Sequence, residues 1–350
     1  MDASGFLKKD FNKSKKILLF LFFTFFILCG QKKESSSIKS GYEEKEKIVE
    51  LFPIFHNGRY VYINKNGEIV ITLSEDVMFA SRFSEGLAVI MKNGKYGFID
   101  ETGKIVIEPI FEFAGDFTEG LARVRINYKW GFIDKKGKLV IDTLYDFAHD
   151  FSEGLAAIRL DWLWGFVDKK GKVVIAPSLE EVKKFSEDLA PARLYGKWGF
   201  IDKTGKFVIQ PQFINAYPFK EGLAPVNLNA RWGYIDKTGK FVISPQYYTT
   251  YGFSEGLARV DTLWCWGFID KNGKFEIKPQ FEELKDFSEG LAGAKKNGKW
   301  GFIDKNGNFI IEPQFDELGD FYLGLAFVRK GYEIGYIDKT GKFIFKTKKY

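Results

Sequence analysis

One phrase recurs along this chain at a constant interval. Residues 197–213 read KWGFIDKTGKFVIQPQF, and nearly the same letters occupy residues 231–247 and 299–315. Superposed on the glycine of the phrase, the copies are 34 residues apart, at Gly97, Gly131, Gly165, Gly199, Gly233, Gly267, Gly301 and Gly335. A leucine in an FSEGLA-like phrase keeps the same step, and a degenerate copy begins at Leu51. We therefore divide residues 51–350 into nine units of one repeat array, with no second domain.

Each unit carries the signals of three short strands. Runs such as LARVRI, KWGFID and KFVI are rich in aromatic and β-branched residues and are bounded by Gly, Asn and Asp, which is typical of antiparallel strands joined by tight turns. Asp202 and Gly205 of DKTG predict a turn in which the carboxylate caps the backbone and the glycine takes positive φ. The Asp of this turn and the Glu of SEGL recur along the array, so we interpret them as turn and cap residues rather than as catalytic carboxylates or calcium ligands.

The pattern predicts an all-β fold, for which two architectures compete. A propeller closes by joining its last blade to its first, and it usually needs four strands from roughly 40 residues or more per blade. Each unit here offers three strands in 34 residues, and the terminal units have Tyr60 and Ile334 in place of Trp, as expected where an outer face has no neighbour. We predict an open superhelical β-solenoid of three-stranded antiparallel meanders, with a β-propeller as the alternative.

The Trp that precedes the repeated glycine is predicted to lie in the core. A buried aromatic ring removes about 150–250 Å² from water, and a unit of this size cannot offset the entropy of its own ordering unless it stacks on a neighbour. These structural residues are Trp130, Trp164, Trp198, Trp232, Trp266 and Trp300.

The first 28 residues predict an export signal. Five lysines precede the apolar run 17–28, which is too short to span a bilayer, since that takes about 20 residues. The run ends at Cys29, and this arrangement resembles the signal of a bacterial lipoprotein, whose first mature residue is a lipid-modified cysteine. The resemblance implies export and a lipid anchor at Cys29 on the cell envelope, at the outer membrane or the periplasmic face. Residues 30–50 are polar and predict a disordered tether between the cysteine and the array. The alternative for the N-terminus is a short uncleaved amphiphilic anchor.

The motif WGFID, followed by a turn and an IxPxF phrase, resembles the WG (KWG) repeat family of bacterial proteins. The resemblance covers nearly all of residues 51–350. It implies a repeat array that is often exported or fused to other modules, and it carries no general activity and no catalytic residues.

Charge and composition narrow the function classes. The formal net charge is +6, and the lysines of the N-terminal segment account for much of it, so the mildly basic array is not predicted to bind nucleic acid. His56 and His149 are the only histidines, and neither has a convincing Cys, Ser or Glu partner near it in the sequence, so we expect no metal, no cofactor and no enzymatic activity.

The informative positions are the variable ones, because a residue repeated in every unit is structural. They cluster at the hairpin turn between the first two strands of each unit, and they predict a ligand ridge of cations and exposed aromatics along one edge of the solenoid. The ridge residues are Arg125, Tyr128, Arg159, Trp162, Arg193, Tyr195, Trp264, Lys295 and Arg329. Such a surface suits an envelope protein or an anionic glycan, through stacking, cation–π contact and bidentate arginine bonds. We predict a non-enzymatic binding or scaffold module. The alternatives are solvated turns on a purely structural spacer, or an envelope hydrolase.

Overall fold

The structure, a computed structural model, describes residues 50–348. The predicted export signal, Cys29 and nearly all of the tether lie outside the described residues. The described part of the chain is all-β, with 35 strands in nine antiparallel sheets, so the all-β prediction is confirmed. No helix in residues 50–348 is long and apolar enough to cross a membrane.

The sheets follow one another along the chain, and we number them as blades 1 to 9. Blade 1 has three strands, β1 (Phe52–His56), β2 (Arg59–Ile63) and β3 (Ile69–Thr72). Each later blade has four strands, hydrogen-bonded in chain order. Their bounds are β4 (Val77–Ala80), β5 (Leu87–Lys92), β6 (Lys95–Asp100) and β7 (Ile105–Phe111) in blade 2; β8 (Phe113–Ala114), β9 (Leu121–Ile126), β10 (Lys129–Asp134) and β11 (Leu139–Tyr145) in blade 3; β12 (Phe147–Ala148), β13 (Leu155–Leu160), β14 (Leu163–Asp168) and β15 (Val173–Leu179) in blade 4; β16 (Glu181–Val182), β17 (Ala190–Leu194), β18 (Lys197–Ile201) and β19 (Phe207–Phe213) in blade 5; β20 (Asn215–Ala216), β21 (Ala224–Leu228), β22 (Arg231–Ile235) and β23 (Phe241–Tyr247) in blade 6; β24 (Thr249–Thr250), β25 (Ala258–Asp261), β26 (Trp266–Ile269) and β27 (Phe275–Phe281) in blade 7; β28 (Glu283–Leu284), β29 (Ala292–Lys296), β30 (Lys299–Ile303) and β31 (Phe309–Phe315) in blade 8; β32 (Glu317–Leu318), β33 (Ala326–Lys330), β34 (Glu333–Ile337) and β35 (Phe343–Lys348) in blade 9.

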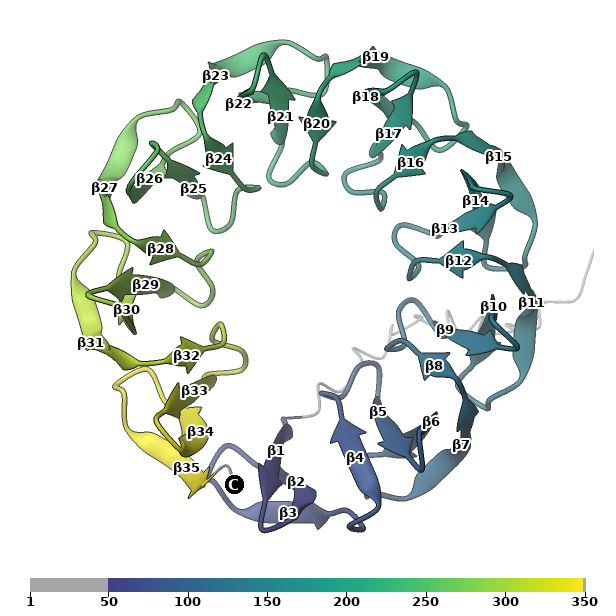
Figure 1. The fold of residues 1–350 in the computed structure, drawn as a ribbon, viewed down its shortest axis with the longest axis vertical. Coiled ribbons are helices and arrows are strands. Elements are labelled where there is room, and N and C mark those ends of the chain that lie inside the picture. The colour runs from purple at the N-terminus through teal and green to yellow at the C-terminus, as the bar shows by residue number, and fades with distance from the viewer. Residues whose placement is uncertain (1–49, 349–350) are drawn as a thin grey trace, which may run out of the picture. The chain divides into compact units, whose positions relative to one another are not determined.

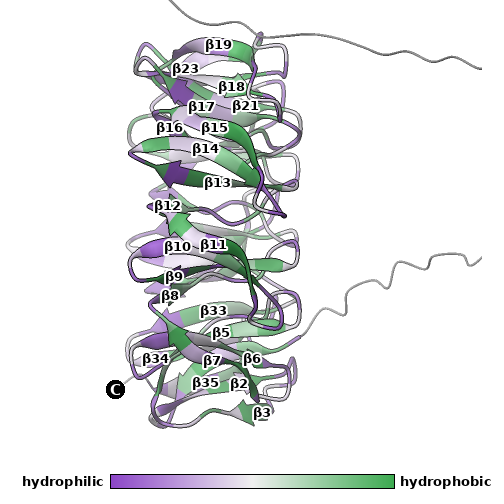
Figure 2. Cartoon of the chain, turned by 90° about the vertical axis from the view of Figure 1, so that its right-hand side faces the viewer, coloured by the Kyte–Doolittle hydropathy of each residue, from purple (hydrophilic) through white to green (hydrophobic). Residues whose placement is uncertain are grey.

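The blades form a closed ring, so the array is a nine-bladed β-propeller and the predicted open solenoid is wrong (Figure 1). Strands such as β11 and β15 follow the outer circumference, and the SEGL turns point toward the centre. Seen edge-on in Figure 2, the blades pack side by side around the ring.

Sequence reasoning missed the first strand of blades 2 to 9, which in blades 3 to 9 is only two residues long. In blade 4 this is β12, which lies one residue after the outer strand β11 but pairs with β13 of the next sheet. A fourth strand this short fits a blade into 34 residues. The stretch between the third predicted strand of one unit and the next unit therefore starts the next blade.

The ends of the array pack against each other. Residues 50–348 contain nine hydrophobic clusters, each shared by two neighbouring blades, and one of them joins blade 9 to blade 1. Its buried members are Phe52, Ile54, Val61, Ile63, Leu325, Ile334 and Tyr336. The loss of Trp in the terminal units is therefore not the mark of a polar end cap, because Ile334 is itself buried in the closing cluster.

The glycine of the WG pair is required by a close approach between strands. A Cβ on Gly199 would lie 2.4 Å from the carbonyl oxygen of Ile209 in the outer strand, which no side chain tolerates. The pairing of β18 with β19 shifts register at this point, which leaves residues 210–212 between the paired positions. Pro211, which has no N–H to donate, lies in this bulge. Four of the six predicted core tryptophans are buried, and Trp266 and Trp300 are half-buried against their clusters.

The repeated acids have the turn and cap roles predicted for them. Asp202 accepts hydrogen bonds from the backbone N–H groups of Thr204 (2.9 Å) and Lys206 (3.1 Å), and Gly205 has a φ of 87°. Glu221 of a SEGL-type turn accepts from the N–H of Gly256 in the next blade (3.1 Å) and pairs with Lys271 (3.2 Å). These contacts recur around the ring, so they stabilise the packing of each blade on the next.

Candidate binding face

Five aromatic side chains stand out of the fold at equivalent hairpin turns. The turns join β9 to β10, β13 to β14, β17 to β18, β25 to β26 and β33 to β34 (Figure 1). Because the blades are related by rotation about the ring, these turns lie on one face of the propeller. We name these five hairpins the aromatic turns. Their aromatic side chains are 80–87% exposed: Tyr128, Trp162, Tyr195, Trp264 and Tyr332.

Three of these aromatics have a backbone conformation that favours glycine. Tyr128, Trp162 and Tyr195 have φ of 62°, 68° and 52°, whereas the same hairpins in other blades use Asn-Gly pairs such as Asn297-Gly298. Asn-Gly is the preferred sequence of a two-residue type I′ turn. A bulky residue at positive φ costs on the order of 1–3 kcal/mol. These side chains therefore do not stabilise their hairpins.

Carboxylates between the last strand of one blade and the first strand of the next hold the aromatic turns in place. Glu112 accepts a hydrogen bond from the backbone N–H of Tyr128 (3.1 Å), and Glu180 accepts one from Gly196 (3.0 Å). Asp146 accepts from the N–H of Asp161 (2.9 Å), beside Trp162. Such bonds fix the aromatic turns before any ligand arrives, which lowers the entropy cost of binding.

Carboxylates in or next to the short first strand of the following blade largely neutralise the predicted ridge cations. Arg125 pairs with Glu112 (3.3 Å), Arg193 with Glu180 (3.6 Å), Lys295 with Glu283 (2.5 Å) and Arg329 with Glu317 (2.6 Å). The side-chain hydrogen bond from Lys299, with one from the Gly331 backbone, holds the pKa of Asp316 below its ordinary value. This face is therefore a mixed surface of paired charges rather than a basic one.

Arg159 differs from the other four ridge cations. Its guanidinium lies over the ring of Trp162, 5.3 Å from the centroid, and over Trp164 at 5.8 Å. No carboxylate among residues 50–348 forms an ion pair with it within 4 Å. Arg159 and Trp162 thus form one cation–π unit at the centre of the three consecutive aromatic turns in blades 3, 4 and 5.

The structure arranges the predicted ridge residues around one face of a ring, not along one edge of a solenoid. Sequence reasoning missed Tyr332, although it stands three residues before Gly335, in the register that identifies Tyr128 and Trp162. In the described part of the chain, no group of three or more His, Cys, Asp or Glu side chains is placed to hold a metal ion.

Comparisons with solved structures agree with the propeller fold. A crystal structure of a eukaryotic initiation factor has a TM-score of 0.61 with 12% sequence identity, covering 86% of this chain and 96% of that one. BamB from Moraxella catarrhalis has a TM-score of 0.45 with 13% identity (73% and 88% covered), and the dihydro-heme d1 dehydrogenase NirN has 0.48 with 11% identity (87% and 74% covered). At such identities the first similarity shows a shared fold alone, and the other two carry no argument.

Comparison with protein families is more specific, while a search of curated proteins returns no match. The family described as "WG containing repeat" matches residues 62–96, 96–130, 130–161, 164–198, 198–232, 232–261, 266–300 and 300–333. These matches cover well over half of the chain, which therefore belongs to the WG-containing repeat family.

Proposed function

We propose that the propeller is a non-enzymatic binding module whose partner docks on the face formed by the aromatic turns. The observation that carries the proposal is that Tyr128, Trp162 and Tyr195 are held almost fully exposed at positive φ. Exposed Trp and Tyr at a strained backbone position lower the stability of the free protein, so their gain must come from a contact outside the fold.

The proposed partner is a protein of the cell envelope. Tyr, Trp and Arg are the residues that most often dominate protein interfaces, and this face presents all three. An anionic glycan is the weaker candidate, because four of the five predicted cations already pair with carboxylates of the protein.

A quantitative capture experiment tests this proposal. The full chain, a Tyr128→Gly/Trp162→Gly variant and an Ile110→Ser/Leu144→Ser control serve as baits for envelope extract and for a soluble anionic glycan. Ile110 and Leu144 are exposed on the outer strands, so the control removes apolar surface away from the face. A captured protein is then purified, and we expect the turn variant to weaken its Kd at least tenfold and the control to leave it unchanged. Equal binding by all three baits would reject the aromatic face and favour a structural spacer.

We also propose that a lipid on Cys29 anchors the module to the envelope. Stable anchoring would take more than one acyl chain. Labelled fatty acid should enter the wild-type protein and not a Cys29→Ala variant, which should also leave the membrane fraction. Equal labelling of both proteins would refute the anchor and leave the binding proposal untouched.

A further inference from the structure

Blades 3 and 4 form a slot near the inner rim, and an arginine fills it. Arg123 of blade 3 places Nε 2.8 Å from the carboxylate of Asp150 in blade 4 and donates from Nη1 to the carbonyl oxygen of Ala148 (2.9 Å). Its guanidinium lies 5.4 Å from the ring centroids of Phe113 and Trp130. The slot thus binds a guanidinium through one carboxylate, one carbonyl and aromatic walls.

The same arrangement occurs four repeats later. Arg259 holds the place of Arg123, and its Nε lies 2.6 Å from Asp286, the equivalent of Asp150. Its Nη1 donates to the carbonyl oxygen of Leu284 (2.6 Å), and the guanidinium lies 3.6 Å from the ring centroid of Tyr251. The same mode of guanidinium binding therefore occurs at two of the blade interfaces.

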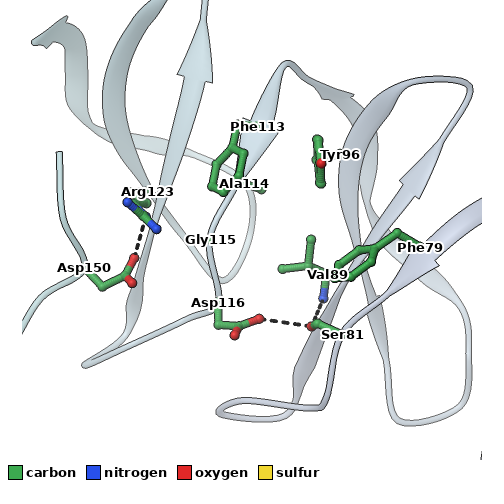
Figure 3. Close-up of a pocket in the computed structure, with 10 residues that line it drawn as sticks. All are labelled: Phe79, Ser81, Val89, Tyr96, Phe113, Ala114, Gly115, Asp116, Arg123 and Asp150. Atoms are coloured by element: carbon green, nitrogen blue, oxygen red, sulfur yellow. Dashed lines mark hydrogen bonds and ion pairs between the residues drawn. The ribbon is translucent and has the colours of Figure 1, made fainter. Parts of the chain in front are cut away.

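Between blades 2 and 3 the arginine is missing while the rest of the slot remains. Val89 stands in its place, and Asp116 is the equivalent carboxylate. The short side chain leaves a cavity of about 260 Å³, which Figure 3 shows between Phe79, Tyr96, Phe113 and Asp116. Gly115 also lines the cavity, and a Cβ there would lie 2.9 Å from Arg123 Nε and from Asp150 Oδ1.

The carboxylate of this slot lacks the arginine that pairs with Asp150 and with Asp286. Asp116 accepts a hydrogen bond from Ser81 Oγ (3.0 Å), and no Lys or Arg among residues 50–348 forms an ion pair with it. Asp150 also lines the cavity but is engaged by Arg123. Partial burial raises the pKa of Asp116, and nearby Asp150 raises it further while Arg123 opposes the rise. A bound cation would relieve this unfavourable ionisation.

A fourth slot, between blades 8 and 9, shows that loss of the arginine does not by itself leave a cavity. Gly293 holds the arginine place there, opposite Asp320. A Cβ on Gly293 would meet Leu318 Cδ1 at 2.8 Å and Lys285 Cδ at 3.2 Å, so other side chains already occupy this space. Asp320 therefore provides a matched control.

We propose that the cavity between blades 2 and 3 is a guanidinium-binding site. The ligand is an arginine side chain of a peptide, or a small guanidine compound, whose head donates to the carboxylate of Asp116 and to the carbonyl of Ala114, as Arg123 and Arg259 do in their slots. The site lies at the inner rim and does not depend on the aromatic turns.

Calorimetric titration of the full chain tests the site with three probes: agmatine, a blocked tetrapeptide with one arginine, and the same peptide with neutral citrulline. We expect one-to-one binding of agmatine and the arginine peptide, and at least tenfold weaker binding of the citrulline peptide. Tighter binding of the arginine peptide than of agmatine would identify a protein segment as the source, and equal binding would identify a small guanidine.

Variants assign the binding to this slot. Val89→Arg should abolish binding by filling the site in cis, Asp116→Asn should weaken it at least tenfold, and Asp320→Asn should leave it unchanged. If Val89→Arg fails to fold, as judged by circular dichroism, Val89→Met fills the same space without charge and should also block binding. The inference is overturned if no guanidinium probe binds at millimolar concentration, if citrulline replaces arginine without loss, or if Val89→Met and Asp116→Asn both bind as the wild type does.

Discussion

Tyr336 of blade 9 donates a hydrogen bond from its phenol to the backbone carbonyl of Pro53 in blade 1, across 3.0 Å. Tyr62 and Tyr234 stand at the same repeat position, and each donates to a carbonyl of the blade that follows it, Ser81 at 2.7 Å and Tyr251 at 2.9 Å. The contact that closes the ring is therefore of the same kind as contacts between blades that are adjacent in sequence. Blade 1 follows blade 9 in space as blade 2 follows blade 1.

Ring closure predicts that Tyr336→Phe and Tyr62→Phe destabilise the protein alike. Each variant loses one partly buried hydrogen bond between blades, which contributes about 0.5–1.5 kcal/mol. The free energies of unfolding, from urea denaturation of both variants, should fall by that amount. A loss for Tyr62→Phe with none for Tyr336→Phe would mean that the first and last blades are not joined in solution.

A closed ring also predicts how the chain responds to being cut and shortened. A circular permutant, with residues 348 and 51 joined by a short Gly-Ser linker and new ends opened at the exposed turn 203–206, keeps all nine interfaces and should fold. Deletion of one whole repeat, residues 189–222, removes a blade and forces eight blades to close at a new angle, so its melting temperature should fall sharply. Thermal melts of the two proteins are the measurement, and the reverse order of stability would favour an open array.

The strained backbone of the aromatic turns predicts that two substitutions by glycine do not lower the free energy of unfolding. Tyr128→Gly and Trp162→Gly restore the residue that the type I′ hairpin prefers, so the free energy of unfolding should stay within about 0.5 kcal/mol of the parent or rise. Trp198→Ala, in contrast, empties a buried site and should cost about 3–5 kcal/mol. Chemical denaturation distinguishes these outcomes. A large loss of stability at Tyr128 or Trp162 would show that these side chains serve the fold instead of a partner.

The lowered pKa of Lys183 predicts that the stability of the protein rises with pH. Burial lowers its pKa to about 8, where the ammonium lies 3.9 Å from the ring centroid of Tyr217 and 5.1 Å from that of Trp198. Between about pH 8 and pH 10 the unfolded chain binds more protons at this residue than the folded one, so the unfolding free energy increases with pH. We expect about 1–2 kcal/mol for this half-buried group, after allowance for solvent screening.

Urea denaturation at pH 7.5 to 9.5 measures this effect, and Lys183→Met should flatten the rise. Lys285→Met is the control, because Lys285 holds the same inner position but is followed in the next blade by Gly319 instead of a tyrosine. Parallel pH curves for the wild type and Lys183→Met would contradict the assignment.

Much of the local structure was predictable because it depends on neighbours in sequence. The Asp202 turn, the strands around Trp198 and Gly199, and the turn position of Tyr128 and Trp162 follow from alternation, turn chemistry and the repeat period. The exposure of the aromatic turns was inferred for the same reason. The pairing of Arg125 with Glu112 could not be inferred from the sequence. Glu112 comes close to this hairpin only because the two-residue strand that follows it, β8, pairs with β9.

The sequence by itself determined an all-β repeat array, with its period, its turns and the residues that bury each unit against the next. Only the tertiary structure decided that the array closes, because closure depends on the small rotation between successive blades summed over the whole ring. That sum brings Phe52 against Tyr336, and no single repeat contains it. The slot at Val89 and Asp116 is likewise visible only in three dimensions, because its two halves belong to different blades and the binding mode that we propose for it is taken from Arg123 and Arg259 in other slots.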